Sequence, residues 1–306
     1  MTLSRQTGLF ANLRRRAAVL AAVRGFFDGR GYLEVETPNR IPAPAPEAHI
    51  EAQPSGNWYL HTSPELCMKR LLAAGSGKIY QICKCYRQGE RGRRHLPEMT
   101  MLEWYAPERD YTHLMAECEA LIPHVAYILG LPARIRYQGR SIDLAAPWSR
   151  LSVDEAFVRY GGCTAAQALA QERFDEVMGL AVEPWLGWDK PVFLHDYPAA
   201  CGALARLKPG RPDVAERFEL YIGGLELCNG FSELIDAAEQ RRRFAAEMDL
   251  RRAAGKTLYP MPEPFLTDLA HMPAAAGNAL GLDRLVMLLT DADEIDQVVA
   301  FTPETL

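Results

Sequence analysis

The chain has 306 residues, is 48% hydrophobic and carries a formal net charge of −5. This length supports a large hydrophobic core in one domain, and the mild acidity argues against a general nucleic-acid or membrane-surface binder. No run of about 18 apolar residues predicts a membrane span.

Hydrophobic periodicity, β-forming residues and turn signals predict a series of helices and strands. In chain order we expect a helix over 13–27, a strand over 32–37, a proline-rich loop over 38–58, a helix from Ser63 to Gly75, strands over 78–87 and 98–107, a helix over 111–129, a hairpin over 133–146, helical segments over 152–188, a strand over 191–198, and helices over 236–254 and 281–290. These elements show no βαβ rhythm. We therefore expect an α+β fold, with a mixed, mostly antiparallel sheet flanked by helices in a single domain over 1–306.

The seven cysteines are scattered, and none forms a C-x-x-C pair. Cys83 and Cys85 are two residues apart on an expected strand, but no His or Cys partner lies at zinc-site spacing. Reduced thiols are therefore the expected state, which is typical of a cytoplasmic protein.

The segment "ELYIGGLELCNGFSEL" (219–234) places Glu219, Glu226 and Glu233 seven residues apart. A helical heptad is excluded because glycines interrupt the segment and its other residues favour strands. A Gly-Gly pair at 223–224 between two such runs predicts a two-residue hairpin.

In that hairpin we expect Glu219 to face Cys228, which puts Glu219 and Glu226 on one face, roughly 7 Å apart at Cα. Two carboxylates this close repel each other unless they are protonated or a cation bridges them. Mg²⁺ held together with a phosphate suits such hard oxygen ligands. The alternative is an exposed acidic hairpin face.

Two further stretches carry cations in positions suited to a nucleotide. The stretch "CYRQGERGRRHLPEMTMLEWY" (85–105) joins two expected strands through a loop whose arginine forks can bind a triphosphate, or which is simply a solvated basic loop. Its cationic residues are Arg87, Arg91, Arg93, Arg94 and His95. In "GNALGLDRLVMLL" (277–289), Arg284 falls in the first helical turn, where a cation opposes the helix dipole. We therefore expect Arg284 to face a nucleotide.

Together with "GYLEVETP" (31–38), these stretches resemble, in order, the three motifs of class II aminoacyl-tRNA synthetases. "TSPELCMKRLL", "HLPEMTMLEWY", "RFELYIGGLELCNGFSEL" and "GNALGLDR" look like signatures of the lysyl-tRNA synthetase branch, and the resemblance covers residues 12–303. It implies a class II catalytic domain that uses ATP and Mg²⁺ to activate an amino acid as an adenylate.

The resemblance also implies roles for individual residues. Arg87 and Arg284 would act in catalysis. ATP would be bound by Arg87, Glu90, Arg94, His95, Met99, Glu219 and Arg284, and the metal by Glu219 and Glu226. The amino acid would be bound by Glu65, Glu103, Tyr105, Asn229, Phe231, Glu233 and Ala279. Among these, Glu103, Tyr105 and Glu233 would hold the side-chain amine, and Glu65 the other amine.

Lysyl-tRNA synthetases carry an N-terminal OB-fold domain that reads the anticodon, whereas the first motif here begins at residue 31. We therefore expect no such domain and no stable tRNA binding. The chain is similar to a truncated branch that attaches (R)-β-lysine to a lysine of translation elongation factor P. That similarity implies elongation factor P and lysine or β-lysine as partners, and motif 1 implies a homodimer. Ala279 occupies a slot that is Gly in the synthetases and Ala in this branch, so an added methyl reshapes the amino-acid pocket.

Two positions depart from the family pattern. Motif 2 has Gly89 where the family has Glu, with Glu90 one place late, and Met99 replaces the Phe that packs on adenine. A thioether packs on a base more loosely than a ring does. Two alternatives therefore stay open: a catalytically silent paralogue that binds an amino acid or nucleotide and regulates a partner, and a ligase that amidates a small amine on the same fold.

Overall fold

The computed structural model describes residues 2–306, with side chains described from residue 7 onward. The helices are α1 (Thr2–Asp28), α2 (Glu65–Ala73), α3 (Tyr111–Ile128), α4 (Val153–Ala156), α5 (Ala165–Ala170), α6 (Phe174–Val177), α7 (Ala237–Ala253), α8 (Glu263–Leu269) and α9 (Leu282–Thr290). The strands are β1 (Leu33–Glu34), β2 (Arg40–Ile41), β3 (Pro54–Ser55), β4 (Trp58–Leu60), β5 (Ile79–Tyr86), β6 (Glu98–Pro107), β7 (Arg134–Tyr137), β8 (Arg140–Asp143), β9 (Ser149–Ser152), β10 (Val192–Pro198), β11 (Leu207–Lys208), β12 (Arg211–Ile222), β13 (Leu225–Ser232) and β14 (Ala275–Gly281).

Short π-helical turns follow α4 and α6, and 3-10 turns connect several later elements. They are η1 (Phe157–Gly161), η2 (Met178–Val182), η3 (Glu183–Trp185), η4 (Ala199–Cys201), η5 (Ile295–Gln297) and η6 (Pro303–Thr305). Within residues 2–306, no helix is both long enough and apolar enough to span a bilayer.

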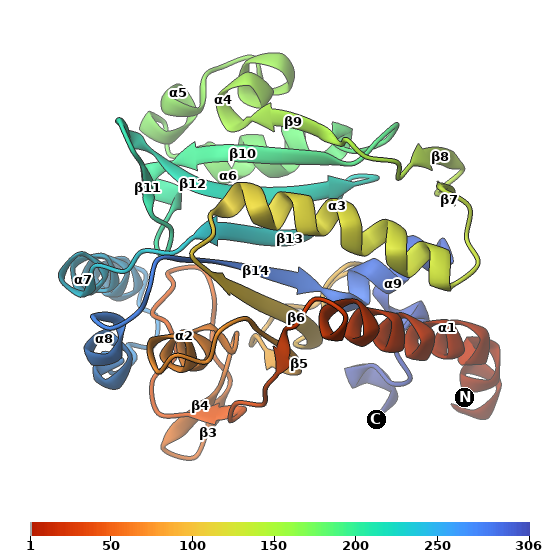
Figure 1. The fold of residues 1–306 in the computed structure, drawn as a ribbon, viewed down its shortest axis with the longest axis horizontal. Helices are drawn as coiled ribbons and strands as arrows, with labels where there is room; N and C mark the ends of the chain where they lie inside the picture. Colours follow the sequence, from red (N-terminus) through yellow and green to blue (C-terminus); the bar gives the residue numbers. More distant parts are fainter. Residues whose placement is uncertain (1) are drawn as a thin grey trace.

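The main sheet runs in the order β1-β5-β6-β14-β13-β12-β10-β9, with β11 beside β12 (Figure 1). The outer pairs β1/β5 and β9/β10 are parallel, and the pairs between them are antiparallel. The predicted mixed, mostly antiparallel sheet flanked by helices is thereby confirmed.

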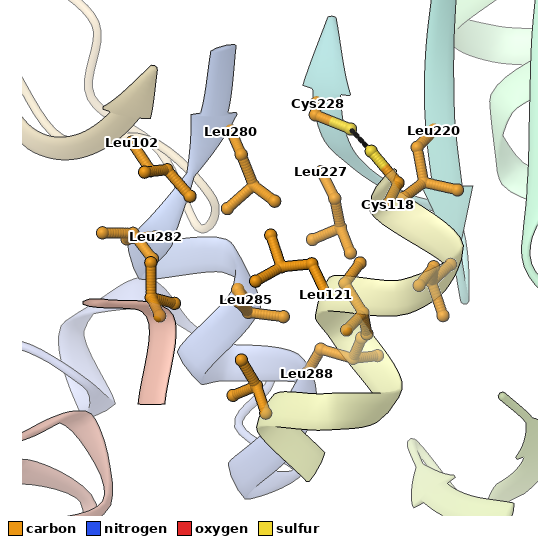
Figure 2. Packing of buried hydrophobic residues seen from close by; sticks show 14 of the residues in the cluster. Leu102, Cys118, Leu121, Leu220, Leu227, Cys228, Leu280, Leu282, Leu285 and Leu288 are labelled. Carbon is orange, nitrogen blue, oxygen red and sulfur yellow. Dashed lines mark hydrogen bonds between the residues drawn. The ribbon is translucent and has the colours of Figure 1, made fainter. Parts of the chain in front are cut away.

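The helices α1, α3 and α9 cover one face of this sheet and enclose a hydrophobic core. Leu102 of β6, Leu220 of β12 and Leu280 of β14 belong to it, as do Leu121 of α3 and Leu288 of α9 (Figure 2). Successive side chains of a strand point to opposite faces, so the residues on either side of these strand leucines point away from α3. The core therefore orients the predicted site residues of three strands toward the other face.

The predicted Gly223-Gly224 turn is present, and both glycines have a positive φ (61° and 69°) that residues with a side chain rarely adopt. Beyond the turn, the predicted register is wrong. A register shift follows the Tyr221–Glu226 pair, so that Glu219 lies opposite Asn229 instead of Cys228. The cause is a β-bulge, which adds one residue to β13.

This bulge decides which side chains of β13 face the same way. Glu226 and Asn229 are three residues apart, and in a regular strand they would point to opposite faces. With the extra residue between them, both line the same cavity. The bulge therefore brings the two residues into one site.

Several element bounds differ from those expected. The first helix begins at Thr2, ahead of residue 13. The strand expected over 32–37 is only two residues long, because β1 lies at the edge of the sheet beside β5. The predicted capping box at Ser152 is present, but the helical region after it is divided into short α- and π-helical pieces. The helix α8 and the strand β9 were not expected, because both are short and lack a clear periodicity.

Candidate active site

A cavity of about 330 Å³ opens where the β5–β6 loop, β12, β13, β14 and the start of α9 meet. Ten of the predicted site residues line it: Arg87, Glu90, Arg94, His95, Met99, Glu219, Glu226, Asn229, Ala279 and Arg284. Five do not, and they form a separate polar cluster beside it: Glu65, Glu103, Tyr105, Phe231 and Glu233. The predicted residues therefore fall into two adjoining groups.

One row of paired residues connects the two groups across five strands. Gln81 lies opposite Glu103, Glu103 opposite Ala279, Ala279 opposite Asn229, and Asn229 opposite Glu219. Directly paired residues project from the same face of a sheet. Ala279 therefore lies between a carboxylate of the polar cluster and the residues that line the cavity.

Glu219 is held in place by three hydrogen-bond donors. Arg217 Nη2 lies 2.6 Å from its Oε1, and the hydroxyls of Tyr197 and Tyr221 each lie 2.6 Å from its Oε2. Arg217 also donates from Nε to Asn229 Oδ1 at 3.0 Å. Burial raises the pKa of the Glu219 carboxyl above its ordinary value, although Arg217 opposes this effect. Its orientation is therefore fixed before any ligand binds.

Glu226 is held by Arg284 from the first turn of α9. Arg284 Nη1 donates to the Glu226 backbone oxygen at 2.8 Å and to its Oε2 at 3.1 Å. Arg284 Nη2 lies 2.6 Å from His95 Nε2, and burial together with Arg284 lowers the pKa of His95. A neutral His95 can thus accept the hydrogen bond, and Arg284 connects the motif 2 loop to β13.

The basic loop divides its cations between two tasks. Arg94 points into the cavity and donates from Nη1 to the Gly224 backbone oxygen at 2.7 Å. Arg91 and Arg93 instead form ion pairs with carboxylates of the segment 293–304. Only part of the arginine run therefore faces the cavity, and the rest attaches the loop to the C-terminal segment.

The polar cluster contains a lysine, Lys69, that was not among the predicted site residues. Lys69 Nζ lies 2.5 Å from Glu65 Oε1 and 2.5 Å from Glu233 Oε2, and it is 5.2 Å from the ring centre of Phe231. The spacing of Glu65 and Lys69, four residues apart on α2, is the sequence signal that could have found this pair. The cluster thus has one cation of its own for several carboxylates.

Glu103 and Glu233 are both buried, and within residues 7–306 neither carboxylate has a cation at each of its oxygens. Glu103 accepts hydrogen bonds from Ser63 at 2.6 Å and from Tyr105 at 2.9 Å, and Glu233 Oε1 has no hydrogen-bond partner among the described residues. Burial raises the pKa of Glu103 and of Glu233 to about 8. Buried carboxyl groups with raised pKa values are suited to receive a cationic ligand.

Gly277 keeps the cluster open. A Cβ at this position would lie 2.4 Å from Glu233 Oε1 and 2.3 Å from the Tyr105 ring. No side chain fits in that space without moving both groups, so glycine in motif 3 preserves the approach to the carboxylates.

Two carboxylates that line the cavity suit a divalent cation. Glu219 and Glu226 both line the cavity, and burial together with these two carboxylates raises the pKa of nearby Glu183. Hard carboxylate oxygens are the ligands that Mg²⁺ takes in proteins, and the donors on Glu219 would orient it as a ligand. The residues present therefore fit the predicted metal.

Two other residues of the site were missed. Arg217 shares a strand face with Glu219 and Tyr221, and this period-two pattern was visible in the sequence. Asp283 is 3% exposed and accepts from the Thr100 backbone at 2.8 Å. It anchors the start of α9 to β6 and so positions Arg284.

Comparisons with known proteins agree with this geometry. The family model described as tRNA synthetases class II (D, K and N) matches residues 1–305. Proteins named elongation factor P–(R)-beta-lysine ligase from Erwinia tasmaniensis, Edwardsiella ictaluri and Pectobacterium carotovorum are 42%, 40% and 41% identical to the chain. The matches cover 95%, 95% and 96% of this chain and 95% of each relative. The predicted resemblance is confirmed, and the chain belongs to the class II tRNA synthetase family of the D, K and N group.

Proposed function

We propose that this protein is an ATP-dependent, AMP-forming ligase that activates (R)-β-lysine or lysine and transfers it to a lysine ε-amine of elongation factor P. The observation that carries the proposal is the row from Glu103 through Ala279 to Glu219, which connects the polar cluster with the cavity. We infer that the cluster binds an ammonium group and the cavity a nucleotide. The names of the three relatives support the choice of amino acid and acceptor.

In the first step, a carboxylate oxygen of the amino acid attacks the α-phosphorus of ATP, the bond to the bridging oxygen breaks, and pyrophosphate leaves. No protein nucleophile is needed, so the enzyme contributes alignment and charge neutralisation. Arg87 lines the cavity beside Glu90 and would bind the α-phosphate. Arg94 and Arg284 would neutralise the outer phosphates, with His95 beside them, and Met99 would pack on the adenine.

The amino-acid side chain would enter the polar cluster. Its terminal ammonium would be bound by Glu233 Oε1, which lacks a partner, and by Glu103 with Tyr105. Glu65 would hold the other amine, in competition with its ion pair to Lys69. Phe231 and Asn229 would border the aliphatic chain. A lysine-like ligand accounts for the number of buried carboxylates, because each buried charge requires a counter-charge.

Glu219 and Glu226 would hold Mg²⁺, which supplies charge neutralisation for the triphosphate and the departing pyrophosphate. Arg217, Tyr197 and Tyr221 fix the orientation of Glu219 through hydrogen bonds. Arg284 donates to Glu226 and could exchange this contact for one to a phosphate.

In the second step, a neutral ε-amine of the acceptor lysine attacks the carbonyl carbon of the adenylate. An amide bond forms, the bond from that carbon to the phosphate oxygen breaks, and AMP leaves with the electron pair. The amine nitrogen releases one proton to solvent as the amide forms.

We further propose that residues 1–306 act as one catalytic domain without stable tRNA binding. The protein would work in the cytoplasm, where its ATP and translation factor occur. It would also form a homodimer. Leu33, on the edge strand β1 of motif 1, is 57% exposed. An exposed leucine on an edge strand supports an interface there.

ATP–pyrophosphate exchange with (R)-β-lysine, α-lysine and aspartate tests the proposal. We expect exchange with the lysines, followed by a mass increase of elongation factor P by one lysyl group when both proteins are mixed. Exchange with no amino acid would support the silent binding protein, and exchange that is best with aspartate would support the small-amine ligase. Either result would overturn the proposal.

A further inference from the structure

Three potential metal ligands meet at a point that the proposed reaction does not use. His61, Cys83 and Cys85 each offer one donor atom, and these atoms all lie within 4.8 Å of one another. The cysteines lie two residues apart on β5 and therefore share a face, whereas His61 comes from the segment between β4 and α2. The fold thus supplies the histidine that the spacing around the two cysteines lacked.

The orientation of His61 leaves one nitrogen free for a ligand. His61 Nε2 lies 2.7 Å from the Lys84 backbone oxygen, a geometry that requires Nε2 to carry the proton. The residue is 1% exposed, and within the part of the chain that the structure describes Nδ1 is buried with no hydrogen-bond partner. Metal-binding histidines characteristically donate their other ring N–H to a carbonyl in this way. An unpaired buried acceptor otherwise costs stability, so it indicates a ligand.

The surroundings of the two thiols are soft and preorganised. Cys83 Sγ and Cys85 Sγ lie 3.9 Å apart as free thiols, and Met101 and Met99 are their cross-strand partners on β6. The backbone of His61 is fixed through both its N–H and its carbonyl oxygen. Its N–H donates to Asn39 O at 2.7 Å, and its carbonyl accepts from Tyr86 N at 3.0 Å. The donors are therefore held together before any ion binds.

We propose that His61, Cys83 and Cys85 bind one Zn²⁺ ion. Thiolate and imidazole ligands select zinc over magnesium, which prefers oxygen, and a Cys₂His set leaves one tetrahedral position for water. Zinc binding joins β5 to the segment before α2. Ser63, two residues after His61, holds Glu103, so the ion stabilises one wall of the polar cluster.

Zinc affinity of the reduced, chelator-treated protein tests this proposal. The titration uses a competing chromophoric chelator in excess Mg²⁺, so that the carboxylates of the cavity do not compete for zinc. We expect one Zn²⁺ per chain, with affinity lowered by more than about 100-fold in Cys83→Ser and Cys85→Ser, a larger loss than changes outside the ligand shell cause. Cys163→Ser, which changes a cysteine outside the cluster, is the matched control and should bind as the wild type does.

A second readout does not depend on folding of the variants. Co²⁺ added to the wild-type protein should give near-ultraviolet thiolate-to-metal absorption, and Zn²⁺ should abolish it. Wild-type zinc affinity equal to that of the double Cys83→Ser/Cys85→Ser variant would overturn the proposal. Cobalt binding without thiolate absorption would overturn it as well.

Discussion

The ammonium nitrogen of Lys69 lies 2.5 Å from Oε2 of Glu233, and both side chains are essentially closed to solvent, at 1% and 0% exposed. The pair connects α2 to the end of β13 inside the polar cluster. It also means that the protein brings its own cation to the place where we propose that a substrate ammonium binds. Glu233 Oε1 has no hydrogen-bond partner in the described part of the chain, so one carboxylate can pair with both cations.

Replacing Lys69 should destabilise the fold strongly. The Lys69→Met variant keeps the length of the side chain but leaves Glu65 and Glu233 without their internal counter-charge. Removing one partner of a buried ion pair costs about 3–5 kcal/mol. Urea unfolding should show this loss in the free energy of unfolding. Lys84→Met is the control, since Lys84 forms an exposed ion pair at 3.5 Å whose loss costs at most about 1 kcal/mol. Equal stabilities of the two variants would contradict the role of Lys69.

The raised pKa values of Glu103 and Glu233 predict how stability depends on pH. Each carboxyl titrates near 8 in the folded state, against an ordinary value of 4.5. The folded protein therefore holds more protons than the unfolded chain between these values, and its stability should fall as pH rises through this window. Thermal melting across the window checks the sign. The fall should be smaller in Glu233→Gln, which removes one of the two groups.

An ammonium group bound beside Glu103 and Glu233 should lower the pKa of both carboxyl groups, because it favours their ionised forms. Binding of lysine below pH 8 should therefore release protons, and the affinity should rise as pH approaches 8. Calorimetry in two buffers with different ionisation enthalpies measures the protons released. Binding enthalpies that do not depend on the buffer would show that Glu103 and Glu233 do not contact the ligand.

Much of the fold was predictable from local patterns. The β5–β6 pair, α3 and the Gly223-Gly224 turn follow directly from alternation, helical periodicity and turn chemistry. The bulge in β13 was not predictable, because its sequence looks like a regular strand until the neighbouring strands fix the register. The length of the edge strand β1 was predicted wrongly for the same reason. The expected strand is longer than the observed one, because the length of an edge strand depends on the strand beside it.

The site was predictable to the extent that family motifs mark it. The motifs identify ten residues that line the cavity, and six of these are carboxylates or arginines. Lys69 and Arg217 were missed, although helical spacing and strand alternation place each beside a predicted residue. The meeting of His61 with Cys83 could not be predicted, because residues far apart in the chain come together only through tertiary folding.

Glu226→Gln should abolish amino-acid activation and leave the fold intact. The substitution removes a negative charge from the proposed metal site but keeps the shape of a side chain that is 36% exposed. Because a metal contributes several kcal/mol of charge stabilisation, we expect ATP–pyrophosphate exchange to fall by about 100-fold or more. Circular dichroism should match the wild type. The exposed Glu176→Gln variant serves as the control. Exchange at the wild-type rate in Glu226→Gln would remove this residue from the metal site.

Met99→Phe should tighten ATP binding. Met99 lines the cavity at the position where the family places a ring on the adenine. An aromatic pair adds about 0.5–1.5 kcal/mol beyond its buried area, so the KM for ATP should fall by roughly 2- to 10-fold. The KM for the amino acid should stay unchanged, since we propose that Met99 contacts the nucleotide and not the amino acid. A change in the amino-acid KM alone would contradict the placement of the adenine.

Ala279→Gly should shift the preference of the enzyme from β-lysine toward α-lysine. The Ala279 methyl lies in the row between Glu103 and Asn229, where the proposed pocket for the amino acid meets the cavity. A single methyl group in such a pocket changes discrimination by about 1–3 kcal/mol, which corresponds to a change of about 10- to 200-fold in the ratio of kcat/KM values. Exchange assays with both amino acids measure this ratio.

The matched control is Ala276→Gly, on the same strand but facing the hydrophobic core. It introduces the same backbone freedom into β14 without opening the pocket, and it should lower stability with no change in the ratio. A ratio that shifts equally in both variants would show that strand flexibility sets the preference. A ratio that shifts in neither would show that the shape of the pocket near Ala279 does not select the amino acid.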